Sequence, residues 1–468
     1  MIPSQKVLPH RANETCYDRL VTLLSKDLDF HGEKSGYASH NFHSFPAKFP
    51  PQLPQMVITN LTQPGDVVLD PMAGSGTAIL EAFLSRRSGI GFDIDPLAIL
   101  ISKVKVTPLD AKQVEDVGIG IIKQAQLSVR SRSDELRGVL DRRWDHKTRN
   151  FIDHWFAPQT QIELLALITE IENIPNESIR EFLKVTFSSL IITKSGGVSL
   201  AFDLAHTRPH LAKVVIDQSG NIILGDNLVD NPSRRIKILT KTLRPTFKEF
   251  EKRLSQNLGG LLNPSLGKIR PCIGYGNAQA LPLRDSSVDL IVTSPPYASN
   301  AIDYMRAHKF SLVWMGNTIG DLSQKRKDYI GGEVLTRIDF EDLPNFTSIL
   351  VAEISNIDEK KGRILHRYYS EMTRTLREMF RVLKPGKVAI VIVGSSMMRG
   401  KDTKTQNFLV DIGQSIGFEV PKIGVRNLDR NRRMLPAGSK INLGSQIQQR
   451  MHKEYVIGFY KPESRGIR

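Results

Sequence analysis

The sequence predicts an α/β fold with a mostly parallel sheet, interrupted by a largely helical insertion. Two blocks carry the α/β pattern, at about 41–108 and 271–461. In each, short apolar runs typical of buried strands alternate with segments of helical periodicity, as in parallel βαβ units. Residues 109–270 lack this alternation, and we expect them to form a separate unit. Residues 1–40 are expected to be an irregular lead-in and residues 462–468 a tail.

The first block contains one complete βαβ unit. A proline-rich turn and a helical pattern, HNFHSFPAKFPPQLPQMVITNL, occupy residues 40–61. DVVLDPMAGSGTAILEAFLSRRSGIGFDID, residues 66–95, then reads as a strand, a glycine-rich turn, an amphipathic helix and a second strand. This order is that of a βαβ unit, so the glycine turn is expected at the carboxyl end of the first strand.

The insertion and the second block are read in the same way. Residues 151–193 have helical spacing, and residues 231–254 are markedly basic. In the second block we expect strands in CIGYGNAQALPL, VDLIVTSPPY and KVAIVIVGSS, and a helix in YYSEMTRTLREMFRVLKPG that ends at Pro-Gly. EYVIGFYK, residues 454–461, is expected as a last strand, and one strand near the end is expected to run antiparallel.

The composition favours a soluble, cytoplasmic protein with a polyanionic partner. Lys and Arg number 64 against 49 Asp and Glu, a formal net charge of +15. Neutralising phosphates releases counterions, so this excess favours nucleic-acid binding. The two cysteines are far apart, with no CxxC, and no apolar run approaches the ~20 residues of a membrane span or the core of a signal peptide. We therefore expect no disulfide framework, no thiolate metal site and no membrane segment.

The glycine turn DPMAGSGT, residues 70–77, predicts an anion-binding loop. Its glycines permit a tight turn, and the helix N-terminus that follows attracts negative charge. Gly74 and Gly76 begin a G-x-G-x-x-G pattern whose third small residue is missing, and the GK[ST] of a P-loop is absent. A nicotinamide enzyme therefore remains open at this point, but the match is incomplete.

Asp70 and Asp93 extend this predicted site. Asp93 ends the second strand, where a carboxylate can accept both hydroxyls of a ribose. Asp93 and Asp95 can instead cap a helix that starts at Pro96, and one aspartate can serve each role. An adenosine ligand with a positively charged amino-acid end would explain Asp70 as well.

The pattern resembles motifs I and II of class I S-adenosyl-L-methionine (AdoMet)-dependent methyltransferases, which have a Rossmann-like sheet. The resemblance implies AdoMet as cofactor, with its carboxylate at the loop, its ammonium at Asp70 and its ribose at Asp93. The family usually has an acidic residue in motif III, where this sequence has Asn277. The cofactor contacts that follow are Asp70, Pro71, Gly74, Gly76, Thr77, Asp93, Asn277 and Lys48.

TSPPY, residues 293–297, ends the strand VDLIVT. Its two prolines stop either a helix or a central strand from continuing. The stretch resembles motif IV, (D/N/S)-P-P-(Y/F/W), of the amino-methyltransferases that modify cytosine or adenine in DNA; related enzymes act on RNA or on protein glutamine. PAKF resembles motif X and GNAQALPL motif III. The resemblance covers most of the two α/β blocks and does not extend to residues 109–270.

The resemblance assigns a role to each residue of this loop. The Ser294 hydroxyl and the Pro295 carbonyl would accept the two N–H bonds of an exocyclic amine and point its lone pair at the methyl group. Pro295 and Pro296 would hold that carbonyl rigidly, and Tyr297 would stack on a base flipped out of the duplex. A carbon-5 cytosine methyltransferase would need a cysteine nucleophile, but Cys272 leads into a strand and is expected in the core.

These features predict a site-specific DNA methyltransferase acting on cytosine N4 in double-stranded DNA, in a restriction-modification or defence setting. A serine at the start of the loop is commoner in the N4-cytosine group, and adenine N6 is the alternative. An RNA amine methyltransferase and an inactive nucleic-acid-binding homologue are the less favoured alternatives. Residues 109–270 are the candidate target-recognition region, and a cognate restriction endonuclease is the further partner that this setting implies.

Basic residues provide candidate phosphate contacts. Those expected to bind nucleic acid are Arg234, Arg235, Lys237, Lys241, Arg306 and Lys309. His308 follows the catalytic loop between two of them and is expected either at the DNA backbone or on a polar helix face. Other histidines lack metal-ligand spacing and are expected at turns or on the surface: His40, His43, His206 and His210. No metal is therefore expected.

Overall fold

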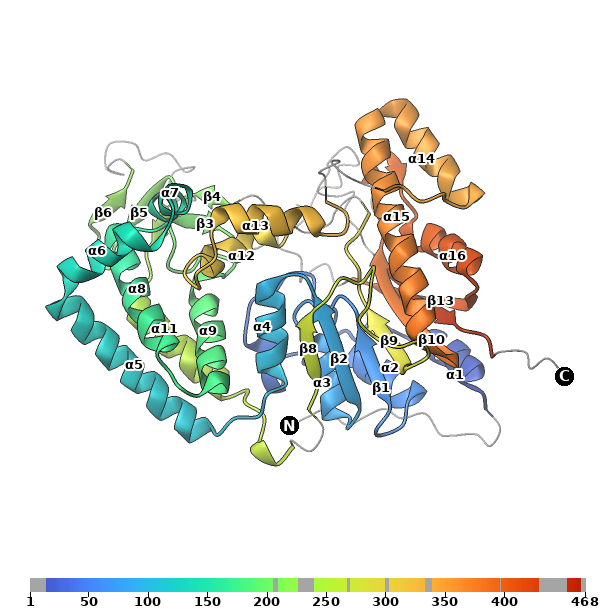
Figure 1. The fold of residues 1–468 in the computed structure, drawn as a ribbon, viewed down its shortest axis with the longest axis horizontal. Helices are drawn as coiled ribbons and strands as arrows, with labels where there is room; N and C mark the ends of the chain where they lie inside the picture. The colour runs from blue at the N-terminus through green and yellow to red at the C-terminus, as the bar shows by residue number, and fades with distance from the viewer. Residues whose placement is uncertain are drawn as a thin grey trace.

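The computed structural model describes the chain from residue 14 to residue 463, with gaps. The described ranges are 14–204, 209–225, 240–266, 270–298, 303–332, 339–395, 397–428 and 453–463. Within them, a central sheet has helices on both faces, and a largely helical unit lies beside the β8 edge of the sheet (Figure 1).

The central sheet has seven strands in the order β13-β14-β10-β9-β1-β2-β8. All neighbours from β8 to β10 pair in parallel, and β14 is antiparallel to both β10 and β13. The expected α/β fold, mostly parallel with an antiparallel strand near the end, is confirmed. The strands are β1 (Val67–Asp70), β2 (Ser88–Asp93), β8 (Cys272–Tyr275), β9 (Val288–Thr293), β10 (Leu383–Gly394), β13 (Glu419–Asn427) and β14 (Lys453–Tyr460).

Both faces of the central strands are covered, which is why they read as continuous apolar runs. On one face, Val68 and Leu290 pack into a cluster with α1 and α2, whereas their neighbours Leu69 and Ile291 pack on the other face with α15 and α16. The helices around the sheet are α1 (Cys16–Leu24), α2 (Gln52–Leu61), α3 (Thr77–Leu84), α4 (Pro96–Lys105), α14 (Asn345–Ile357), α15 (Glu359–Val382) and α16 (Thr405–Ile416).

The N-terminal region contains α1, which the sequence did not predict. Thr15 and Asp18 form a capping box, and Leu20 and Leu24 are buried against the sheet. Gly458 of β14 lies so close that an added Cβ would stand 2.7 Å from Leu20 Cδ1. The expectation of an irregular lead-in is therefore wrong for residues 16–24, because one face of this short helix completes the core.

The insertion is largely helical, as expected, and residues 151–193 lie mainly in α7, α8 and α9. Its helices are α5 (Ala111–Ser131), α6 (Ser133–Arg143), α7 (His146–Trp155), α8 (Pro158–Glu172), α9 (Glu177–Ile191) and α11 (Thr246–Leu258). It also holds short strands that the sequence did not predict: β3 (Ala201–Asp203), β4 (His210–Leu211), β5 (Val214–Ile216), β6 (Ile222–Leu224) and β7 (Thr240–Thr242).

The segment that follows the SPPY loop (residues 294–297) packs into the core of this helical unit. α12 (Met305–Leu312) and α13 (Ile319–Lys325) contribute buried residues to the core that Phe156 and Phe182 also occupy. Trp144 Nε1, in the insertion, donates to Val313 O, at the end of α12, at 2.9 Å. The catalytic loop therefore connects the sheet directly to the helical unit. A small hairpin, β11 (Met397–Met398) and β12 (Lys401–Asp402), follows β10.

Candidate active site

The candidate site lies where the direction of winding reverses, between β1 and β9. From β1 the chain continues towards β2 and β8, whereas β9 leads towards β10, and ligands of such sheets bind at the carboxyl ends of the strands at this point. A cavity of about 940 Å³ opens there. The predicted site residues that line it are Lys48, Asp70, Pro71, Gly74, Thr77, Asp93, Asn277, Ser294, Pro295, Pro296, Tyr297 and Arg306.

The glycine turn connects β1 to α3 through two left-handed residues. Gly74 has φ of +50° and Gly76 has φ of +72°, a region that disfavours residues with a Cβ. A Cβ added at Gly76 would also stand 2.8 Å from the Cβ of Ser102. Gly76 does not line the cavity, so its contribution is the shape of the turn.

Two side chains of helix α4 donate hydrogen bonds to carbonyl oxygens of the glycine turn. Ser102 Oγ donates to Gly74 O at 2.9 Å, and the fully buried Lys105 donates through Nζ to Ser75 O at 2.7 Å. On the cavity side, Asp93 Oδ2 accepts the Gly74 N–H at 2.8 Å. This role of Lys105 could not be predicted from the sequence, because a lysine in the last turn of a helix is ordinarily exposed.

We expect Gly76→Ala to lower both the unfolding temperature and the affinity for AdoMet. The added methyl meets Ser102 in a strained conformation, so roughly 1–3 kcal/mol of stability should be lost. Thermal unfolding and calorimetric titration measure the two effects. Gly120→Ala is the control, because nothing lies within 4 Å of its added Cβ in helix α5. Equal unfolding temperatures for the two variants would contradict the expectation.

Asp70 and Asp93 place two uncompensated carboxyl groups in the cavity. Burial raises the pKa of Asp70 to about 7, with a further contribution from Asp93. Burial, followed by the charge of Asp95, raises the pKa of Asp93 to about 6. Within the described ranges no basic side chain forms an ion pair with either group. A ligand that brings a positive charge or hydroxyl donors would stabilise their ionised forms.

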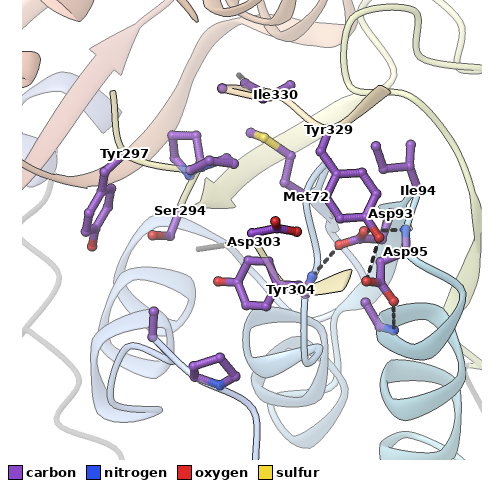
Figure 2. A pocket seen from close by; sticks show the side chains of 18 of the residues that line it. Met72, Asp93, Ile94, Asp95, Ser294, Tyr297, Asp303, Tyr304, Tyr329 and Ile330 are labelled. Carbon is purple, nitrogen blue, oxygen red and sulfur yellow. Dashed lines mark hydrogen bonds between the residues drawn. The ribbon is translucent and has the colours of Figure 1, made fainter. Parts of the chain in front are cut away.

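Asp95 differs from Asp93 because protein groups satisfy it. As the N-cap of α4, its Oδ1 accepts from Leu97 N and Ala98 N. Its Oδ2 accepts from Tyr329 Oη at 2.7 Å (Figure 2). The same oxygen accepts from His308 Nδ1, also at 2.7 Å. Burial acts to raise the pKa of Asp95, but these two partners outweigh it and lower the pKa. The expectation that one aspartate caps the helix is confirmed for Asp95.

The predicted catalytic loop, residues 294–297, leaves β9 directly into the cavity. Ser294 is half-buried and Pro295 is buried, and Figure 2 shows Ser294 between Tyr297 and Tyr304. Tyr297 Oη donates to Glu454 Oε1 at 3.0 Å, and Glu454 in turn pairs with Arg426. The phenol is therefore tethered to the last strand, β14.

Two further predicted cofactor residues already have protein partners. Asn277 Oδ1 accepts the Gln279 N–H at 3.0 Å, which uses one of its two lone pairs. Lys48 Nζ donates to His40 O at 2.9 Å. Both residues line the cavity, and their contacts with a cofactor remain predictions.

The predicted phosphate contacts have different positions in the structure. Lys241 is buried in β7 and donates to Ser199 O and Ala201 O, so its predicted contact with DNA is wrong. Arg306 pairs with Asp303 at 2.8 Å at the cavity wall, and Lys309 lies over the Phe151 ring, 4.9 Å from its centroid. Their roles remain predictions. The described ranges do not include Arg234, Arg235 and Lys237.

The positions expected for His308 and Cys272 are wrong, and two histidines expected at turns or on the surface do lie at turns but are buried. His40 and His43 are buried, the first bound to Glu81 at 2.7 Å and the second to Ser188 at 2.9 Å, rather than at the surface. His308 is buried against Asp95, so it neither contacts DNA nor lies on a polar face. Cys272 is exposed on the edge strand β8 rather than in the core. His206 lies outside the described residues, and His210 is exposed.

Several cavity residues were missed by the sequence reasoning. Tyr304, His308, Tyr329 and Ile330 all line the cavity. Tyr304 stacks on Phe45 with ring centroids 4.9 Å apart. The spacing of Tyr304 and His308, one helical turn apart directly after the catalytic loop, is the signal that could have placed them on one side of α12.

The described ranges contain neither a cluster of metal ligands nor a membrane-spanning helix. No group of three or more His, Cys, Asp or Glu side chains there could hold a metal ion. None of the helices described is long and apolar enough to cross a membrane.

The cavity suits AdoMet in size and in chemistry. Its volume of about 940 Å³ is at the upper end of ligand pockets. The glycine turn at the start of α3 suits a carboxylate, and Asp93 keeps lone pairs for hydroxyl donors. Asp70, which forms no ion pair with the described residues, suits an ammonium group.

Comparison with known proteins places this site in a family. A family model described as DNA methylase, for N6 and N4 methyltransferases, matches residues 26–104, which include the glycine turn and Asp93. The Type II methyltransferase M.MvaI of Kocuria varians is 23% identical over 409 residues, covering 81% of this chain and 83% of that protein.

Two further relatives match over a similar extent. M.AvaI of Nostoc sp. is 26% identical over 403 residues, covering 76% of this chain and 74% of that protein. M.BsoBI of Geobacillus stearothermophilus is 23% identical over 435 residues, covering 82% and 79%. The match to the methyltransferase family supports AdoMet as the cofactor, and the cavity suits it. The glycine turn, Asp93 and the relatives over most of the chain's length together support a DNA amino-methyltransferase of the N4/N6 family.

Proposed function

We propose that the protein is a site-specific Type II DNA methyltransferase that methylates cytosine N4 in double-stranded DNA. The observation that carries the proposal is the position of Ser294, which lines the same cavity as Asp70 and Asp93. Its relatives are named Type II methyltransferases, which supports a restriction-modification setting with an endonuclease acting on the same site. The serine at the start of the loop favours cytosine N4 over the alternative, adenine N6.

The chain's own residues would prepare the target amine. AdoMet, when bound, supplies an electrophilic methyl group. The lone pair of an exocyclic amine is delocalised into the base, so it needs acceptors for both N–H bonds before it can act as a nucleophile. Ser294 Oγ and the Pro295 carbonyl would provide them, and the two prolines keep that carbonyl preorganised. The Tyr297 ring lines the cavity and would stack on the flipped base.

The rim of the cavity is basic, which suits the phosphates beside a flipped nucleotide. The basic lining residues away from the cofactor residues are Arg306, Arg326, Lys327, Lys360 and Lys361. Arg306 and Arg326 both pair with Asp303, so part of their charge is already compensated. Lys327 and Lys360 are exposed. Their contacts would position DNA without reading its sequence.

We expect N4-methylcytosine to form when unmethylated plasmid is incubated with the protein and AdoMet. Enzymatic hydrolysis of the DNA followed by nucleoside mass spectrometry identifies the product. A reaction without AdoMet is the control. N6-methyladenine alone would overturn the choice of cytosine but keep the amine chemistry. Absence of any modified base, with protein shown to be folded, would overturn the proposed function.

A further inference from the structure

Four of residues 327–331 line the cavity, and this segment, here called the strap, is anchored on two sides. On one side, Tyr329 Oη donates to Oδ2 of Asp95, which lies two residues after Asp93 at the end of β2. His308 donates to the same oxygen, and Asp95 also caps α4. The strap is thus bound to the most extensively hydrogen-bonded carboxylate of the site.

On the other side, α15 binds the backbone of the strap. Arg367 Nη2 donates to Lys327 O at 2.9 Å and to Tyr329 O at 3.3 Å. Glu371 Oε2 accepts the Gly331 N–H at 2.8 Å. Arg367 and Glu371 are both buried and pair with each other at 2.8 Å, one helical turn apart. Two buried charges are costly unless well paired, so this arrangement fixes the backbone of the strap firmly.

These anchors hold the Tyr329 ring against the part of the cavity that Asp93 faces. Tyr329, Ile330 and Gly331 all line the cavity. Figure 2 shows the ring beside Ile94 and close to Asp93, with Met72 on its other side. A ring tethered at its hydroxyl loses little freedom when a flat ligand packs on it. The position therefore fits an adenosine whose ribose is bound by Asp93.

We propose that Tyr329 is an AdoMet-binding residue, whose ring forms one wall of the adenosine pocket and is held in place by Asp95. The proposal rests on the cofactor and not on which base is methylated. It also gives the strap a function: it joins the helical unit, through α13, to the cofactor site. A purely structural strap would predict no change in ligand binding when the ring is removed.

The test compares Tyr329→Ala and Tyr329→Phe in the full chain by calorimetric titration with AdoMet, without DNA. Because stacking on an aromatic ring contributes about 1–3 kcal/mol per base, Tyr329→Ala should weaken AdoMet binding by about tenfold or more. Tyr329→Phe keeps the ring but loses its tether, so it should lose only about two- to fivefold. Adenosine alone should show the same order. Tyr275→Ala, at an exposed position on β8, should bind AdoMet normally.

The unfolding temperature and hydrogen–deuterium exchange distinguish a role of Tyr329 in AdoMet binding from a purely structural role. If Tyr329→Ala lowers the unfolding temperature but binds AdoMet as tightly as the wild type, the proposal is wrong. If that variant does not fold, hydrogen–deuterium exchange on the wild type decides: AdoMet should protect the amides of residues 327–331. Equal exchange with and without AdoMet would overturn the proposal. Each outcome is independent of whether cytosine or adenine is the target.

Discussion

Replacing Ser294 with alanine is expected to slow methyl transfer by roughly 100- to 1000-fold, the range for losing one preorganised hydrogen-bonding group at a reacting centre. Affinity for AdoMet should change by less than about twofold, because the proposed role of the loop is to contact the target amine rather than the amino-acid or ribose parts of the cofactor. Single-turnover kinetics with saturating DNA measure the rate constant, and calorimetry measures the affinity.

A matched control exists in the same cavity. Ser323 lines the wall, but its hydroxyl donates to Ile319 O within α13, so Ser323→Ala should transfer methyl groups at the wild-type rate. The assignment of Ser294 fails if its alanine variant keeps the wild-type rate constant. It fails equally if the whole loss lies in the affinity for AdoMet, since the serine would then belong to the cofactor site.

Much of the sheet could be predicted because its strands are buried on both faces. Val288–Thr293 is entirely buried, and such a run is apolar whatever its neighbours are. Helix α1 could not be predicted in this way, since its nine residues carry only a short apolar stripe. The attachment of α12 and α13 to the helical unit depends on Trp144 and Val313, which are 169 residues apart in sequence.

The parts of the site that could be predicted are contiguous in sequence, whereas the parts that could not be predicted consist of residues that are far apart in sequence. The glycine turn and the catalytic loop are contiguous, so each carries its signal in a few neighbouring residues. The Asp95 cluster is not contiguous, since His308 lies 213 residues and Tyr329 lies 234 residues from their partner. Residue type alone was also misleading, because Lys241 is buried while Cys272 is exposed.

AdoMet is expected to bind more tightly as the pH rises from about 5 to about 7.5, by roughly ten- to a hundredfold in total. The pKa of Asp70 is about 7 and that of Asp93 about 6, so both carboxyl groups are largely protonated at the acidic end. Only the ionised Asp70 attracts an ammonium group, and only the ionised Asp93 is a strong acceptor for ribose hydroxyls. Calorimetry at several pH values measures the change.

The stability of the ligand-free protein should move in the opposite direction. Both folded-state pKa values lie above the ordinary value of 3.8, so the folded protein holds these protons more tightly than the unfolded chain does. Their contribution to stability is present in full below pH 3.8 and is lost as the pH rises through 6 and 7. AdoMet should therefore raise the unfolding temperature most near neutral pH.

Asparagine variants assign the two steps of this pH dependence. Asp70→Asn should remove the step near pH 7, and Asp93→Asn the step near pH 6, each at the cost of weaker binding at neutral pH. Around pH 6.5, binding of AdoMet to the wild type should also release protons, which titrations in buffers of different ionisation enthalpy detect. An affinity that stays constant with pH, together with no proton release, would show that neither carboxylate binds the cofactor in its ionised form.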